Sequence, residues 1–118
     1  MILVDTSVWV DHFRKAERQL VTLLTDQAVF CHPFVIGELA CGTLTHRAEI
    51  LELLARLPRA PMADHPEALS LVESHQLMNS GIGWIDVHLL ASARLAGARL
   101  WTKDRGLARA AARLNISI

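Results

Sequence analysis

Four acidic residues stand where the sequence pattern predicts an apolar interior, and they are Asp5, Glu38, Asp86 and Asp104. Asp5 and Asp104 each follow a short apolar run of the kind that forms a buried strand. Glu38 and Asp86 lie on predicted helices, on faces that they share with apolar residues. An acid without a basic partner in such surroundings costs stability, because its charge loses contact with water. The four acids together therefore indicate a shared site for a hard cation.

The types of these residues indicate which cation and which chemistry. Mg²⁺ and Mn²⁺ prefer oxygen ligands and keep several waters, so a carboxylate set without Cys or His favours them over zinc. Such a cation lowers the pKa of water and neutralises charge on a phosphate, which suits hydrolysis of a phosphodiester. Without the cation, clustered carboxylates repel one another, and at least one pKa rises.

Each acid also has a purely structural explanation to be weighed. Asp5 and Asp104 precede predicted helices, where an acid is a good N-cap, and Asp86 suits the dipole of a first helical turn. Glu38 lacks such an explanation, because it lies in the middle of a helix. Its neighbours at helical spacing are Phe34, Val35, Cys41 and Gly42. The alternative to a metal site is thus a set of caps plus one buried ion pair.

Strands alternate with helices along the chain. Strands are predicted at 2–5, 28–31, 57–62, 100–102 and 116–118, and helices at 8–13 with a cap at Thr6 or Ser7, 17–25, 33–41, 46–56, 66–78, 84–96 and 104–114. Pro58 and Pro61 make the third strand weak and edge-like. This order predicts an α/β fold with a mostly parallel sheet covered on both faces, in one domain over 1–118. In such sheets, sites lie beyond the carboxyl ends of the strands.

The composition limits the class of protein. Of the 118 residues, 52% are hydrophobic, yet charges interrupt every apolar run before it reaches the length of about 20 residues that spans a membrane. Asp5 and Asp11 also break the pattern of a signal peptide. We therefore expect a cytoplasmic protein without a membrane partner, in which Cys31 and Cys41 are reduced thiols of the core.

Basic residues gather near the end of the chain. Lys plus Arg and Asp plus Glu number 12 each, but the segment 94–113 holds six basic residues and only one acid, Asp104. If the other acids meet Asp104, an acidic pit lies beside a basic rim, which suits a phosphate-chain substrate. Arg94, Lys103 and Arg105 are the candidates for contacts with its phosphates.

Four segments that carry the acids resemble the PIN domain, and more narrowly the VapC-type toxins of bacterial toxin–antitoxin pairs. The segments read MILVDTSVW at 1–9, IGEL at 36–39, GIGWID at 81–86 and LWTKD at 100–104. The resemblance covers essentially the whole chain, in order and at this length. It implies a three-layer α/β/α sandwich around a mostly parallel sheet.

The resemblance also implies an activity and its partners. It implies an endoribonuclease dependent on Mg²⁺ or Mn²⁺ that leaves 5′-phosphate and 3′-hydroxyl ends. The catalytic and metal-binding quartet would be Asp5, Glu38, Asp86 and Asp104, with Ser7 and Thr102 as supporting hydroxyls. The implied partners are RNA, a small cognate antitoxin and a second copy of the chain in a homodimer.

Other interpretations compete with this one. The chief alternative is a non-catalytic PIN-like module that binds RNA or a partner, and a phosphorylated receiver domain is a weaker one. His88 lies two residues from Asp86, which places it on another helical face, so we expect no chemistry from it. Trp9, Phe13 and Trp84 are predicted to be core residues, or else part of an apolar surface for an antitoxin helix.

Overall fold

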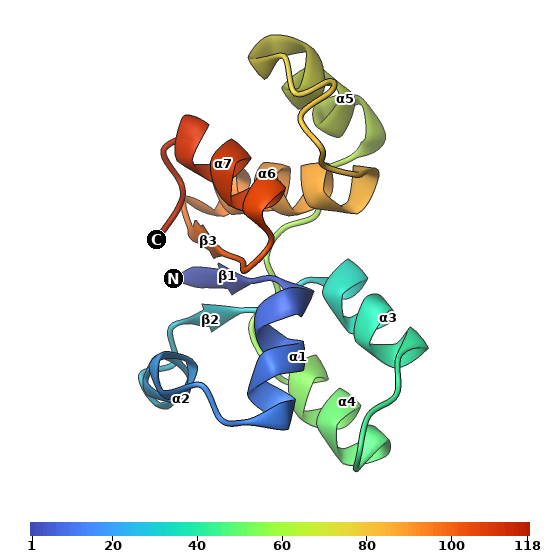
Figure 1. Ribbon diagram of the computed structural model, residues 1–118, viewed down its shortest axis with the longest axis vertical. Helices are drawn as coiled ribbons and strands as arrows, with labels where there is room; N and C mark the ends of the chain where they lie inside the picture. Colours follow the sequence, from blue (N-terminus) through green and yellow to red (C-terminus); the bar gives the residue numbers. More distant parts are fainter.

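The sheet is small, parallel and central. The computed structural model describes residues 1–118, and its strands are β1 (Ile2–Val4), β2 (Val29–Phe30) and β3 (Arg99–Trp101). Their order is β2-β1-β3, with Ile2 opposite Val29 on one side and Arg99 on the other. All three arrows point the same way in Figure 1, so the segments that follow the strands begin at one edge of the sheet.

Seven helices surround this sheet. They are α1 (Thr6–Arg14), α2 (Arg18–Thr25), α3 (Pro33–Cys41), α4 (Arg47–Ala55), α5 (His65–His75), α6 (Trp84–Ala96) and α7 (Arg105–Arg113). Helix α6 packs on β1 and β3, while α3 packs on α1 and α4. The predicted α/β/α sandwich with a parallel sheet is confirmed. Separately, the helices include no apolar segment of the length that spans a membrane.

Two predicted strands are reduced to single parallel bridges. The segment 57–62 contributes one isolated bridge, between Arg59 and Cys31, and 116–118 contributes another, between Ser117 and Leu100. Proline lacks the N–H that a ladder needs, so Pro58 and Pro61 prevent a longer pairing in the first segment.

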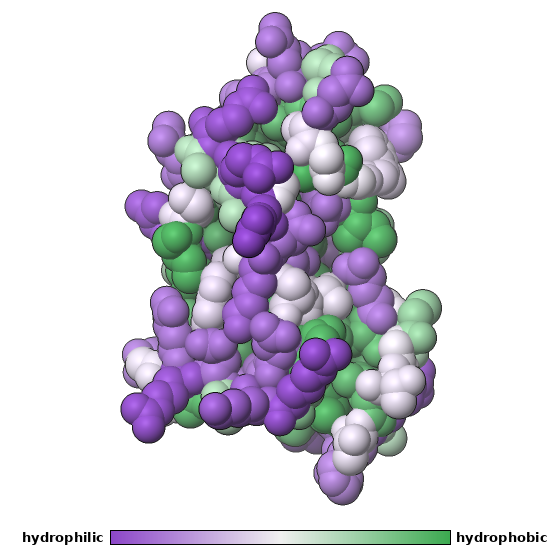
Figure 2. All heavy atoms as spheres, in the orientation of Figure 1, coloured by the Kyte–Doolittle hydropathy of each residue, from purple (hydrophilic) through white to green (hydrophobic).

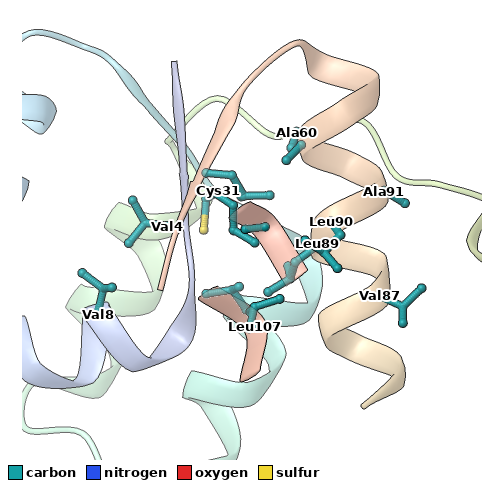
Figure 3. Close-up of a cluster of buried hydrophobic side chains, with 14 of the residues drawn as sticks. Val4, Val8, Cys31, Ala60, Val87, Leu89, Leu90, Ala91 and Leu107 are labelled. Atoms are coloured by element: carbon teal, nitrogen blue, oxygen red, sulfur yellow. The ribbon is translucent and has the colours of Figure 1, made fainter. Parts of the chain in front are cut away.

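The hydrophobic core extends over both faces of the sheet, and one part of it lies where α6 and α7 cover the strands. Leu89 and Leu90 of α6 and Leu107 of α7 are fully buried, and Figure 3 shows them pointing toward the strands and Cys31. Burying an aliphatic side chain of this size stabilises a fold by about 1.5–3 kcal/mol. Cys41, in contrast, is exposed, so the prediction of two core thiols is wrong for that residue; both thiols are free. The prediction failed because α3 is apolar on nearly every side.

His32 connects two helices that matter for the site. Its Nδ1 accepts a hydrogen bond of 3.0 Å from the N–H of Phe34, which caps α3. Since Nδ1 is the acceptor, the neutral ring carries its proton on Nε2, which lies 3.0 Å from the hydroxyl of Ser92 on α6. Both side chains are fully buried. This bridge sets the start of α3 against the middle of α6.

Candidate active site

The four predicted acids lie at the edge of the sheet toward which the strands point. Asp5 follows β1, Asp104 follows β3, Glu38 lies on α3 and Asp86 lies in the first turn of α6. Figure 1 shows α1, α3 and α6 at this same edge. The N–H of Asp5 donates to the carbonyl oxygen of Trp101 at 2.9 Å, which places the ends of β1 and β3 side by side.

Electrostatics show that the acids share one neighbourhood. Burial raises the pKa of Asp86 above its ordinary value, and the negative charges of Asp5, Asp104 and Glu38 raise it further. The N–H of Gly83 acts in the opposite direction, because its hydrogen bond favours the charged form of Asp86. Residues that are far apart in the sequence therefore repel one another in space.

Each acid is held by the protein through one oxygen only. Thr6 donates to Oε1 of Glu38 at 2.7 Å, the Gly83 N–H donates to Oδ2 of Asp86 at 3.2 Å, the Leu107 N–H donates to Oδ1 of Asp104 at 2.9 Å, and two hydroxyls donate to Oδ2 of Asp5. The second oxygen of each carboxylate accepts no hydrogen bond from the protein. Four oxygens thus remain available for a ligand.

The two predicted supporting hydroxyls both contact Asp5. Ser7 Oγ donates to Asp5 Oδ2 at 2.8 Å, and Thr102 Oγ1 donates to the same oxygen at 2.7 Å. The N–H groups of Lys103 and Asp104 in turn donate to Ser7 Oγ and Thr102 Oγ1, at 3.0 Å each. This network joins the start of α1 to the β3–α7 connection and orients the carboxylate of Asp5.

The expectation that all four acids belong to the apolar interior is wrong. Only Asp5 is buried, with 6% of its surface exposed; Asp86 is half-buried, and Glu38 and Asp104 are exposed. On α3 the buried residues are Val35 and Leu39, so Glu38 faces outward. Glu38 and Asp104 are therefore open to solvent, whereas Asp5 is not.

The structural explanations of the acids apply in part. Asp104 caps α7 through its side chain, and Asp86 accepts a hydrogen bond at the start of α6. Asp5 precedes α1 but makes no side-chain cap. A capping role accounts for one oxygen of Asp104 and leaves the position of Asp5 and Glu38 unexplained.

No basic side chain neutralises the four acids. The ion pairs of the structure join Arg56 to Glu52 and Lys103 to both Asp11 and Glu17. No three Asp, Glu, His or Cys side chains converge closely enough to form a finished metal cage. The donor set nevertheless fits Mg²⁺ or Mn²⁺, because it consists of carboxylate oxygens on an open surface where the ion keeps several waters.

The three candidate phosphate ligands fare differently. Lys103 Nζ lies 3.0 Å from Asp11 and 2.9 Å from Glu17, so its charge is already paired. Arg94 lies on α6 eight residues beyond Asp86, a rise of about 12 Å, and its Nη1 is 2.5 Å from His75 Nε2. Arg105 is exposed directly after Asp104 and forms no ion pair, so it is the one candidate that stands free beside the acids.

Sequence reasoning missed two residues of the site. The sequence predicts Thr6 as a possible cap of α1, yet its hydroxyl holds Glu38 of α3. His32 had no assigned role, although it links α3 to α6. The His32-Pro33 pair was the available signal, because a residue that accepts a hydrogen bond before a proline is typical of a helix start.

His88 is buried, and its Nδ1 has no hydrogen-bond partner in the protein.

Comparisons with known proteins place the chain in a family. The model of the PIN domain matches residues 2–113 of the chain. Two curated relatives, each called Ribonuclease VapC32, come from Mycobacterium tuberculosis strains CDC 1551 / Oshkosh and ATCC 25618 / H37Rv. Each is 47% identical over 119 aligned residues, which cover 100% of this chain and 96% of the relative.

Proposed function

The chain belongs to the PIN-domain family and, within it, to the VapC-type toxins, and from this premise we propose that it is a metal-dependent endoribonuclease. The relatives' printed name, Ribonuclease VapC32, supports RNA as the substrate. We further propose that one domain over 1–118 carries the activity.

The observation that carries this proposal is the set of four acids that are each held through one oxygen. The free oxygens of Asp5, Glu38, Asp86 and Asp104 would hold Mg²⁺ or Mn²⁺, directly or through waters. When bound, the ion supplies charge neutralisation at the phosphate and lowers the pKa of nearby water. The raised pKa of Asp86 fits this role, because a cation would relieve the repulsion that raises it.

The remaining residues orient the acids and the substrate. Ser7 and Thr102 hold one oxygen of the buried Asp5. The carboxylate is therefore already oriented before a ligand arrives, and it need not be ordered during the reaction. Thr6 does the same for Glu38. Arg105 would contact a phosphate that flanks the cleaved bond, and hydrolysis would leave a 5′-phosphate and a 3′-hydroxyl.

Family membership also supports a cognate antitoxin, a homodimer and a cytosolic location as parts of this proposal. A groove of about 680 Å³ between α1, α3 and α4 is a suitable place for an antitoxin helix. Its apolar lining comprises Val10, Phe13, Leu39, Leu44 and Ile50, and Glu38 stands at its border. Figure 2 shows apolar residues gathered over these helices at the lower right. A partner seated there would reach the acids with its end.

Cleavage of single-stranded RNA by the purified protein tests the proposal. We expect cleavage with Mg²⁺ or Mn²⁺, none with EDTA, and none with Asp5→Asn or Asp86→Asn. Asp26→Asn is the matched control, because Asp26 is an exposed aspartate at the end of α2 that belongs to no ion pair. Cleavage that survives EDTA and both site changes would contradict a metal mechanism. A folded protein without any cleavage would favour the non-catalytic module instead.

A further inference from the structure

Trp84 is a large aromatic side chain on the surface, and it follows Gly83, whose N–H holds Asp86 at 3.2 Å. It begins α6 two residues before Asp86, and 40% of its surface is exposed. Of the two expectations for Trp84, a core position is therefore wrong, and a position on an exposed apolar surface remains. An exposed tryptophan is costly to keep in water, since its ring offers a large apolar surface. Because Asp86 folds back onto the Gly83 N–H, the start of α6 carries both the exposed indole and this carboxylate.

The ring of Trp84 is held in place by its neighbours. The ring of His88 meets it nearly perpendicularly, with centroids 4.8 Å apart, and His65 from the start of α5 lies 5.1 Å away at 55°. His88 is itself buried and packs edge-on against Phe34 of α3, at 5.1 Å. These contacts hold the ring of Trp84 in one orientation. A flat ligand that stacks on the ring therefore costs little additional side-chain entropy.

Ile85, the residue after Trp84, lines a depression that also includes one of the four acids. This shallow depression of about 450 Å³ lies between α3 and the start of α6. Its lining consists of Pro33, Phe34, Gly37, Glu38, Cys41 and Ile85. Glu38 belongs both to this lining and to the four acids. A Cβ at Gly83, just before Trp84, would meet nothing within 4 Å apart from its chain neighbours, so the start of α6 is open there.

Charge around the site is a poor source of affinity for a polyanion. The chain has a formal net charge of +0, Lys103 is paired with two acids, and the four carboxylates repel phosphates until a cation binds. Nucleic-acid binding that relies on phosphate contacts needs several free basic residues. Single-stranded RNA offers a second source of affinity, because its unstacked bases bind on aromatic rings.

We propose that Trp84 is a stacking platform for a nucleobase adjacent to the phosphate at the acid site. This inference rests on the proposed ribonuclease function and adds a substrate-positioning residue to it. The base packs on the indole while the neighbouring phosphate lies at Asp86. The indole accepts any base, but purines bind more tightly than pyrimidines because they offer more stacking surface.

Fluorescence anisotropy in the Asp5→Asn background separates binding from cleavage. The probes are a labelled 12-nucleotide oligoadenylate, the matching oligouridylate and a 12-unit RNA backbone without bases. We expect the oligoadenylate to bind best and the baseless strand worst. Trp84→Ala should weaken oligoadenylate binding by about 5- to 100-fold and leave the baseless strand unaffected. Trp84→Phe should recover most of the loss.

Controls distinguish stacking from a general effect on the fold. Leu95→Ala removes another exposed apolar side chain from the far end of α6, where 51% of Leu95 is exposed, and should not change affinity. Melting temperatures should be similar for all variants. If Trp84→Ala does not fold, RNA-dependent quenching of tryptophan fluorescence, present in the parent and absent in Trp84→Phe, gives the same answer.

Several results would overturn the inference. They are unchanged oligoadenylate affinity in Trp84→Ala, an equal loss for the baseless strand, or no measurable binding of oligoadenylate by the parent. A change in molecular mass with unchanged RNA affinity would assign Trp84 to an interface between copies instead. The proposed function fails separately: base-dependent binding through Trp84 with no metal-dependent cleavage would contradict the ribonuclease and leave the stacking site intact.

Discussion

The bridge from His32 to Ser92 leads to a prediction about stability and pH. Burial lowers the pKa of His32 to about 4, and the charge of His88 acts in the same direction. The neutral ring is required because Nδ1 accepts the hydrogen bond that caps α3. In the unfolded chain the same imidazole has its ordinary pKa, near 6.5.

The sign and the size follow from these two values. Between pH 6.5 and pH 4 the unfolded state binds a proton that the folded state excludes, so stability falls as the pH is lowered through this window. Above pH 6.5 the contribution is fully present. A difference of 2.5 pKa units at about 1.4 kcal/mol per unit gives a full effect of about 3 kcal/mol, of which about 2–3 kcal/mol is lost by pH 4.5.

His32→Asn isolates this contribution. Asparagine is a good N-cap and does not titrate, so the variant keeps the cap of α3 and loses the bond to Ser92. We expect it to be less stable than the parent at pH 7.5, and the difference to shrink by about 2–3 kcal/mol at pH 4.5. Urea unfolding followed by circular dichroism at both pH values measures this. A difference that stays constant with pH would refute the account of His32 as a buried neutral residue.

Three further predictions concern the site itself. In EDTA, Asp86→Asn should melt at a higher temperature than the parent at pH 7.5 and lose this advantage toward acidic pH. The reason is that a carboxyl with a raised pKa destabilises the fold as the pH rises through that pKa. If the variant melts at a lower temperature than the parent at pH 7.5 in scanning fluorimetry, the acids do not repel one another as described. Thr102→Val should lower the free energy of unfolding in urea by about 1.5–3 kcal/mol and reduce RNA cleavage, since the buried Asp5 loses one of its two hydrogen-bond donors. Thr102→Ser keeps the hydroxyl and should retain both the stability and the cleavage. Equal behaviour of the two variants would argue against this role. Lys103→Gln should leave the KM for RNA nearly unchanged, because the ammonium of Lys103 is already paired with two acids. Arg105→Gln should raise this KM. Steady-state kinetics with the opposite ranking would reverse our assignment of the phosphate ligand.

The order of helices and strands was predictable because the signals for it are local. Short apolar runs predicted β1 and β3, and Gly97 with its positive φ of 62° ends α6 where expected. Once the sheet was predicted to be parallel, the carboxyl ends of β1 and β3 had to lie at one edge. Asp5 and Asp104 therefore had to lie at the same edge of the sheet, whereas the adjacency of β1 and β3 is seen only in the structure.

The parts that sequence reasoning missed depend on contacts between distant segments. Helix α3 is apolar on nearly every side, so its sequence does not show that Glu38 and Cys41 face outward; only the packing of α3 on α1 and α4 decides this. The pairing of Lys103 with Asp11 and Glu17 joins segments more than eighty residues apart. No periodicity in either segment indicates such a pair.

The central claim is that the four acids form one site for divalent cations. The melting temperature of the protein with millimolar Mn²⁺ tests this claim most directly. A ligand that binds only the folded state stabilises it by mass action, about 2.7 kcal/mol at a concentration of 100 Kd. We predict a higher melting temperature with Mn²⁺ for the parent and for Asp26→Asn, and little or no increase for Asp86→Asn. An increase of equal size in all three proteins would contradict the claim, because Mn²⁺ would then bind elsewhere.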